Sequence, residues 1–200
     1  MANSARTVMP PRDKAVASAR ERILEAADRL FYRDGIRAAG VDTIIAEAGV
    51  AKMTLYAHFK SKDELIAAYL RRRDLLVCSG MTEAVERFAA ESGDWLEALF
   101  AALKEWFASP EFRGCAFINA TAELPDPSHP GRIAVAEHKR NFASLLAEVL
   151  RKAGVPAPQD AAEVVALLID GAIVRAVRDD SPAAADNALA ATKKLLGRTR

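Results

Sequence analysis

Seven side chains between residues 52 and 62 have the chemistry to contact a nucleic acid. A lysine ammonium group attracts phosphate, and tyrosine or histidine can donate a hydrogen bond to phosphate or stack on a sugar. Methionine and the threonine methyl group suit contact with the methyl group of thymine, whereas lysine can donate to guanine. The set comprises Lys52, Met53, Thr54, Tyr56, His58, Lys60 and Lys62.

These side chains stand in a stretch with the apolar spacing of two short helices joined by a turn. Apolar residues recur on one helical face over residues 41–48 and again over residues 52–59. Gly49 between them can adopt the left-handed conformation that ends a helix. Ser61, with Glu64 three residues later, is a capping box that predicts the start of the next helix. The two apolar faces consist of Val41, Ile44, Ile45, Ala48, Leu55 and Phe59.

A helix, a glycine-containing turn and a second helix form the layout of a helix-turn-helix, whose second helix enters the DNA major groove. At these residues the chain resembles the tetracycline-repressor (TetR) family of bacterial transcriptional regulators. The matching string over residues 48–65 is AGV-x-K-x-TLY-x-HF-K-SK-x-EL, preceded by an amphipathic helix that ends LFYRDG. The close resemblance covers about residues 20–69, and the later segments GCAFINATAELPDPSHP and AEHKRNFASLLAEVL are similar to the ligand-binding half of some members.

The resemblance implies an all-α fold with an N-terminal three-helix helix-turn-helix DNA-binding domain and a C-terminal helical ligand-binding and dimerisation domain. Two positions depart from the family, because Gly40 stands where threonine is common and Ala51 replaces a common hydroxyl residue. Thr43 could supply the contact that Gly40 lacks. Thr43 and Ala51 therefore join the seven side chains above in the predicted DNA-binding set.

Composition and charge agree with a soluble protein that has a polyanionic partner. Hydrophobic residues make up 51% of the chain and charged residues 28%, which excludes a disordered protein. The net charge of +1 is uneven, since residues 1–73 carry 14 Lys+Arg against 9 Asp+Glu. No apolar run approaches the ~20 residues of a membrane span, and the first residues lack the apolar core of a secretion signal. Cys78 and Cys115 fit neither a disulfide framework nor a zinc-ligand spacing, so we expect a cytoplasmic protein.

The chain divides into three predicted parts: a flexible basic arm at residues 1–16, the helix-turn-helix domain at 17–62, and a helical effector-binding and dimerisation domain at 63–200. Within the last part, a second capping box is expected at Asp160 and Glu163. The triplet at residues 71–73, three arginines, is expected to be solvated. Helices are predicted at residues 17–34, 41–48, 52–59, 61–79, 81–91, 94–108, 110–123, 131–153, 160–178 and 182–196.

Aromatic residues concentrate between residues 88 and 117, and the family resemblance implies a small-molecule cavity in this region. Stripes of this kind also form ordinary protein cores. An apolar and aromatic lining favours a small apolar or aromatic effector, oriented by a few polar groups. The candidate effector-binding residues are Trp95, Leu99, Phe100, Leu103, Cys115, Phe117, Asn119, Thr121 and Glu123.

Two of the later helices are apolar around more of their circumference than a one-sided surface helix requires. Such helices can be buried on two sides, one against their own subunit and one against a symmetry mate. The resemblance likewise implies a two-fold homodimer through a four-helix bundle. The candidate interface residues are Phe142, Leu145, Leu146, Val149, Leu168, Ile169, Ala172, Ile173 and Ala176.

The leading hypothesis is a homodimeric transcriptional repressor that binds a palindromic double-stranded DNA operator and is released by a small molecule. One alternative is an effector-binding or scaffold protein whose helix-turn-helix does not read sequence. An enzyme that uses Cys115 or His58 is disfavoured because the sequence shows no triad-like clustering, no paired carboxylates and no phosphate-binding loop. A redox sensor at Cys115 is disfavoured because Arg113 alone does not establish the depressed pKa that a reactive thiol needs. His129 and His138 do not share a helical face, so capping or surface roles are expected, with no metal, cofactor or catalytic site.

Overall fold

The structure is a computed structural model that describes residues 17–198, so the predicted basic arm at residues 1–16 lies outside the described residues. Every regular element in the described part is an α-helix, which confirms the predicted all-α fold. Within residues 17–198, no helix combines the length and the apolar character needed to cross a membrane. The helices are α1 (Ala19–Asp34), α2 (Val41–Ala48), α3 (Lys52–His58), α4 (Lys62–Ser92), α5 (Trp95–Phe107), α6 (Ala116–Glu123), α7 (Pro130–Lys152), α8 (Pro158–Asp179) and α9 (Ala183–Leu195).

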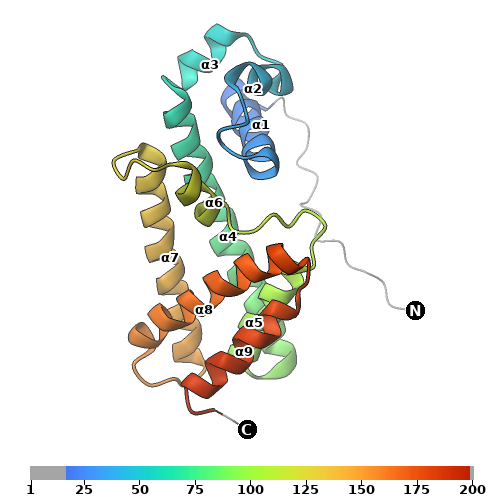
Figure 1. The fold of residues 1–200 in the computed structure, drawn as a ribbon, viewed down its shortest axis with the longest axis vertical. Coiled ribbons are helices and arrows are strands. Elements are labelled where there is room, and N and C mark those ends of the chain that lie inside the picture. The colour runs from blue at the N-terminus through green and yellow to red at the C-terminus, as the bar shows by residue number, and fades with distance from the viewer. Residues whose placement is uncertain (1–16, 199–200) are drawn as a thin grey trace, which may run out of the picture.

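Helices α1, α2 and α3 pack together at one end of an elongated molecule (Figure 1). Gly49 ends α2 with φ of 61°, in the left-handed region, so the chain turns into α3 without the strain that a side chain would add. Leu55 of α3 is fully buried and Phe59 directly after it is 1% exposed. These two side chains hold α3 against the other helices, and the predicted helix-turn-helix is confirmed.

Helix α4 runs without interruption from this unit into the rest of the molecule (Figure 1). The predicted break between residues 79 and 81 is therefore wrong. Gly80 lies on the exposed side of α4, where the absence of a side chain removes no packing. Its helix-propensity cost of ~1 kcal/mol is offset because Met81 and Val85 continue the buried face.

The remaining helices form the body, in which α5 and α7 pack along α4, α8 packs on α7, and α9 packs on α5 and α8. Helix α6 begins at Ala116, so the predicted helical start at residue 110 is wrong. The reason is tertiary: the Tyr32 hydroxyl of α1 donates to the Gly114 carbonyl at 2.9 Å and accepts from the Arg113 N–H at 3.1 Å. These bonds hold the segment before α6 as a loop.

The start of α8 also differs from the prediction. The residue before the helix is Ala157, with φ of 46°, and Pro158 occupies the first helical position. Asp160 therefore lies inside the first turn, and the capping box predicted for Asp160 and Glu163 is wrong. Proline sets φ for the first turn by itself, so this helix starts without a side-chain cap.

Candidate nucleic-acid interface

The predicted DNA-binding residues lie on the outer side of α3, on α2 and on the turn into α4. Met53 is 79% exposed and Tyr56 is 41% exposed, while Leu55 between them is fully buried. One side of α3 therefore presents polar and aromatic side chains to solvent, while the opposite side is buried in the apolar core. The exposed members are Thr43, Ala51, Lys52, Met53, Tyr56, His58 and Lys60, and the half-buried members are Thr54 and Lys62.

Lys52 at the start of α3 pairs with Asp42 of α2. The Lys52 Nζ atom lies 3.1 Å from the Asp42 Oδ1 atom, and both side chains are largely exposed. The hydrogen bond to Asp42 raises the pKa of Lys52, so the ammonium stays charged. Because an ion pair this exposed adds little stability, Lys52 can exchange Asp42 for another partner at small cost.

The turn between α3 and α4 is held by a variant of the predicted capping box. The Ser61 hydroxyl accepts a hydrogen bond from the Glu64 N–H at 3.1 Å, as predicted. The Glu64 carboxylate accepts from the backbone N–H of Lys60 at 2.9 Å, one residue before the usual return bond to the capping residue. These two bonds fix the backbone of the turn and leave the Lys60 side chain exposed.

Lys62 has a structural contact that the sequence did not predict. Its Nζ atom donates to the Ile36 carbonyl at 2.6 Å and lies 5.8 Å from the centre of the Phe31 ring. Partial burial lowers the pKa of Lys62. Lys62 therefore links the connection between α1 and α2 to the start of α4 by a hydrogen bond, whereas the Lys60 side chain is exposed to solvent.

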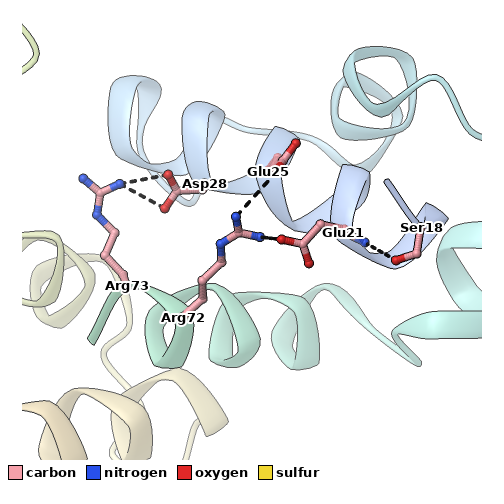
Figure 2. Close-up of polar contacts among 6 residues, drawn as sticks. All are labelled: Ser18, Glu21, Glu25, Asp28, Arg72 and Arg73. Carbon is pink, nitrogen blue, oxygen red and sulfur yellow. Dashed lines mark hydrogen bonds and ion pairs between the residues drawn. The ribbon is translucent and has the colours of Figure 1, made fainter. Parts of the chain in front are cut away.

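Two arginines of α4 reach acidic side chains on α1, as Figure 2 shows. Arg72 Nη1 lies 2.7 Å from a Glu21 oxygen, and Arg73 Nη1 lies 2.9 and 3.0 Å from the two Asp28 oxygens. The two arginine side chains are only 23% and 19% exposed. The prediction that the arginine triplet is solvated is wrong for these two residues, because their partners lie on a helix that is distant in sequence.

Glu123 at the end of α6 joins the body to the connection between α1 and α2. Its carboxylate accepts hydrogen bonds from the backbone N–H groups of Ile36 at 3.1 Å and Arg37 at 2.7 Å. Gly35, with φ of 95°, permits the approach, since a Cβ there would stand 3.3 Å from the carboxylate oxygens. The side chain predicted to orient an effector is thus engaged by the end of the molecule that holds the helix-turn-helix.

A cavity of about 600 Å³ opens between α4, α5 and α7. Of the predicted effector-binding residues, Trp95 lines this cavity, and the structure does not bring the others to it. Burial raises the pKa of the Cys115 thiol, which is the opposite of what a reactive thiolate requires. Leu99, Phe100, Leu103, Cys115 and Phe117 are buried in the core, while Asn119 and Thr121 are exposed on α6.

The same cavity is lined by Asp74, Cys78 and Asn141, which the sequence analysis did not select. His138 lies next to them and is 3% exposed, so the surface role expected for it is wrong; α7 turns this side chain toward α4 and α6. His129 caps α7, as expected, by accepting from the Gly131 N–H at 2.9 Å. The available sequence signal was the four-residue spacing of Asp74 and Cys78 on one helical face.

The predicted dimer residues of α7 and α8 point mainly into their own subunit. A different set of apolar side chains on α8 faces solvent, with exposures of 37% for Val164, 73% for Leu167, 54% for Val174 and 50% for Val177. The apolar face of α8 that is exposed therefore consists of other residues than the predicted dimer interface. Phe142, Leu146, Val149, Ile169, Ala172, Ile173 and Ala176 are buried, and Leu145 and Leu168 are half-buried.

Comparison with known proteins matches both halves of the chain. Residues 23–69 match the family model of bacterial regulatory proteins, tetR family, and residues 93–192 match the tetracyclin repressor-like, C-terminal domain. The HTH-type transcriptional regulator LmrA of Bacillus subtilis (strain 168) is 30% identical over 168 residues, which cover 78% of this chain and 84% of the relative. The HTH-type transcriptional repressor NemR of Escherichia coli (strain K12) is 26% identical over 187 residues, which cover 88% of this chain and 93% of the relative.

A solved structure supports the same assignment. The crystal structure of a TetR-family transcriptional regulator from Streptomyces coelicolor superposes with a TM-score of 0.75 at 36% sequence identity, covering 90% of this chain and 94% of that chain. The first family match contains the exposed face of α3, and the second contains most of the helical body. The chain therefore belongs to the TetR family of bacterial regulatory proteins, with an N-terminal helix-turn-helix domain and a C-terminal helical domain.

Proposed function

We propose that the protein is a ligand-responsive transcriptional repressor that binds a palindromic operator as a homodimer. The observation that carries this proposal is the outer face of α3, where Met53 and Tyr56 are exposed above the buried Leu55 and Phe59. In a helix-turn-helix this helix enters the major groove, where base edges can be read. Family membership points to a DNA-binding regulator rather than to an enzyme, and NemR, one of the relatives, is named a repressor.

We assign the reading head to residues 17–62 and the effector-binding and dimerisation body to residues 63–200, with α4 crossing between them. At the head, Lys60 would contact phosphate, because its side chain is exposed beside the fixed turn into α4. Lys52, Met53 and Thr54 lie at the start of α3, where they would meet base edges. Tyr56 and His58 would donate to phosphate or stack against sugar.

We assign the dimer contact to the exposed stripe of α8. Val164, Leu167, Gly171 and Val174 recur every three or four residues, the spacing that forms one seam between paired helices. Gly171 is exposed with open space around it, so a partner helix could approach closely there. A two-fold axis through this seam would present two α3 helices to half-sites about 34–36 Å apart.

We assign the effector to the cavity between α4, α5 and α7. Its apolar lining includes Leu75, Val85, Trp95 and Val149, which suits a small apolar or aromatic compound. Helix α4 both lines this cavity and carries the arginines that pair with α1, so a displacement of α4 would move the reading head. A coupling free energy of ~1–3 kcal/mol between the two sites is ordinary for such a switch.

Gel-shift titrations with the DNA upstream of the protein's own gene test the proposal. The full-length protein should shift this DNA at concentrations that leave a scrambled duplex free. A double variant, Met53→Ala with Tyr56→Ala, should lose this preference while its circular dichroism spectrum stays unchanged, because both side chains are exposed. Equal affinity for both duplexes would overturn sequence reading and favour the scaffold alternative, in which only the cavity is functional.

A further inference from the structure

Three side chains with metal-ligand chemistry meet between α4 and α7. The Asp74 Oδ1 atom lies 2.7 Å from His138 Nδ1 and 3.4 Å from Cys78 Sγ. Asn141 donates to the second Asp74 oxygen at 2.6 Å. The ligand atoms of Asp74, Cys78 and His138 all lie within 4.8 Å of one another. A carboxylate, a thiol and an imidazole at this range form a ligand set for a borderline-soft divalent ion.

The fold orients these groups before any ion arrives. Asp74 and Cys78 stand four residues apart on α4, so they share one face of the helix. The His138 ring on α7 is stacked on Phe117, with the ring centres 3.5 Å apart and the planes within 7° of parallel. This stacking fixes the plane of the imidazole while Nδ1 faces Asp74. A site held on two packed helices loses little conformational freedom when it is filled.

One of these separations already matches that of a tetrahedral zinc centre, and a second would have to lengthen. Bonds of about 2.0–2.3 Å place neighbouring ligand atoms roughly 3.3–3.6 Å apart in such a centre. The 3.4 Å between Asp74 and Cys78 is already in this range. The 2.7 Å between Asp74 and His138 is a hydrogen-bond distance, and it would widen when the ion replaces the shared proton.

Charge balance also favours a divalent cation. The Asp74 side chain is only 13% exposed, and its charge is compensated here by hydrogen bonds. Loading would transfer the Cys78 thiol proton to solvent and place the His138 proton on Nε2, so that one carboxylate and one thiolate neutralise the ion. Thiolate and imidazole ligands disfavour Mg²⁺ and Ca²⁺, which prefer oxygen ligands.

We propose that Asp74, Cys78 and His138 bind one Zn²⁺ ion, or a similar borderline-soft divalent ion, and that this ion is an effector of the regulator. Asp74 and Cys78 line the cavity assigned above to the effector, so the fourth position of the ion would open into it. Arg73, the neighbour of Asp74 in sequence, pairs with Asp28 of α1 (Figure 2). An ion that changes the spacing between Asp74 and α7 therefore acts directly beside a contact with the reading head.

Zinc titration of the untagged, full-length protein tests the site. We expect about one Zn²⁺ per chain in competition with a chromophoric chelator, and Co²⁺ should give a thiolate absorption band. Cys78→Ser, which is nearly isosteric, should weaken binding at least about 100-fold and abolish the band. His138→Phe, which keeps an aromatic ring on Phe117, should weaken binding similarly. Cys115→Ala, which removes the other thiol, is the matched control and should bind normally.

Each outcome decides a separate part of the proposal. Absence of stoichiometric binding, or normal binding by Cys78→Ser, overturns the ion site. The effector role rests on the proposed function, and it requires that Zn²⁺ change operator affinity by about 5–150-fold in wild type but not in Cys78→Ser. Ion binding without this change, in a protein that shifts operator DNA, overturns the effector role. If the protein shifts no DNA in either state, the proposed function fails, and the zinc titration still decides the site.

Discussion

The carboxylate of Glu123 accepts a 2.7 Å hydrogen bond from the backbone N–H of Arg37, and the Arg37 guanidinium donates to the Glu123 carbonyl at 3.0 Å. The two residues are thus joined in both directions, although α6 belongs to the body and Arg37 lies between α1 and α2. Helix α6 packs on α4 and α7, which line the cavity. The body and the helix-turn-helix unit are therefore joined directly by hydrogen bonds at Glu123.

Glu123→Gln should destabilise the protein by about 1–3 kcal/mol, because the amide NH₂ cannot accept and one backbone N–H of Ile36 or Arg37 loses its partner. Urea unfolding followed by circular dichroism measures the change. Glu91→Gln, which neutralises an exposed carboxylate near the end of α4, is the matched control and should lie within about 0.5 kcal/mol of wild type. Equal stabilities of the two variants would contradict a structural role for the Glu123 carboxylate.

Tyr32→Phe should loosen the loop before α6. The phenyl ring can keep its place beneath the Arg73 guanidinium, whose carbon lies 3.7 Å from the ring centre, but the bonds to Gly114 and Arg113 are lost. We expect a loss of about 1–3 kcal/mol and faster amide hydrogen exchange near Arg113. Unchanged exchange in that loop would show that the hydroxyl does not hold it.

Lys60→Ala and Lys62→Ala should fail in different ways. Lys60→Ala should weaken binding to all DNA sequences and reduce the salt slope by about 1, with no loss of stability. Lys62→Ala should lower stability by about 0.5–1.5 kcal/mol, because its bond to the Ile36 carbonyl is lost. Gel shifts at several salt concentrations and urea unfolding separate the two effects. An unchanged salt slope for Lys60→Ala would mean that Lys60 does not contact phosphate.

Met53→Ala should alter operator preference without altering the fold. Met53 is 79% exposed, so its truncation should change stability by less than about 0.5 kcal/mol. Loss of an apolar contact with a base should reduce discrimination at one or two operator positions, where a mismatched base pair typically costs about 1–3 kcal/mol. Selection from a randomised duplex pool measures this preference, and an identical selected motif would place Met53 away from the bases.

Leu167→Glu should convert a dimer into monomers, because it places a charge in the middle of the exposed apolar stripe of α8. Analytical ultracentrifugation measures the molecular mass, and operator affinity should fall together with dimerisation. Ile133→Glu on α7, where the side chain is 49% exposed, is the matched control. A dimer that survives Leu167→Glu would place the interface elsewhere.

Local patterns in the sequence were sufficient to predict the helix-turn-helix. The glycine turn, the spacing of Leu55 and Phe59, and the Ser61 cap involve residues no more than a few positions apart, so their contacts follow from helix geometry. The same patterns predicted which side of α3 faces outward. They failed at Gly80, because packing of α5 and α7 along α4 outweighed the weak propensity of one residue.

Contacts between distant segments were decided only by the tertiary structure. The sequence specified helices with apolar faces, but the partners of Arg73, Lys62 and Glu123 lie 26 to 87 residues away. Spacing along one helix carries no information about which residues of another helix it will meet. For the same reason, the family resemblance implied a cavity in the body, but of the residues selected for its lining only Trp95 lies on it. Only the packing of α4 against α7 brought Asp74, Cys78 and His138 together.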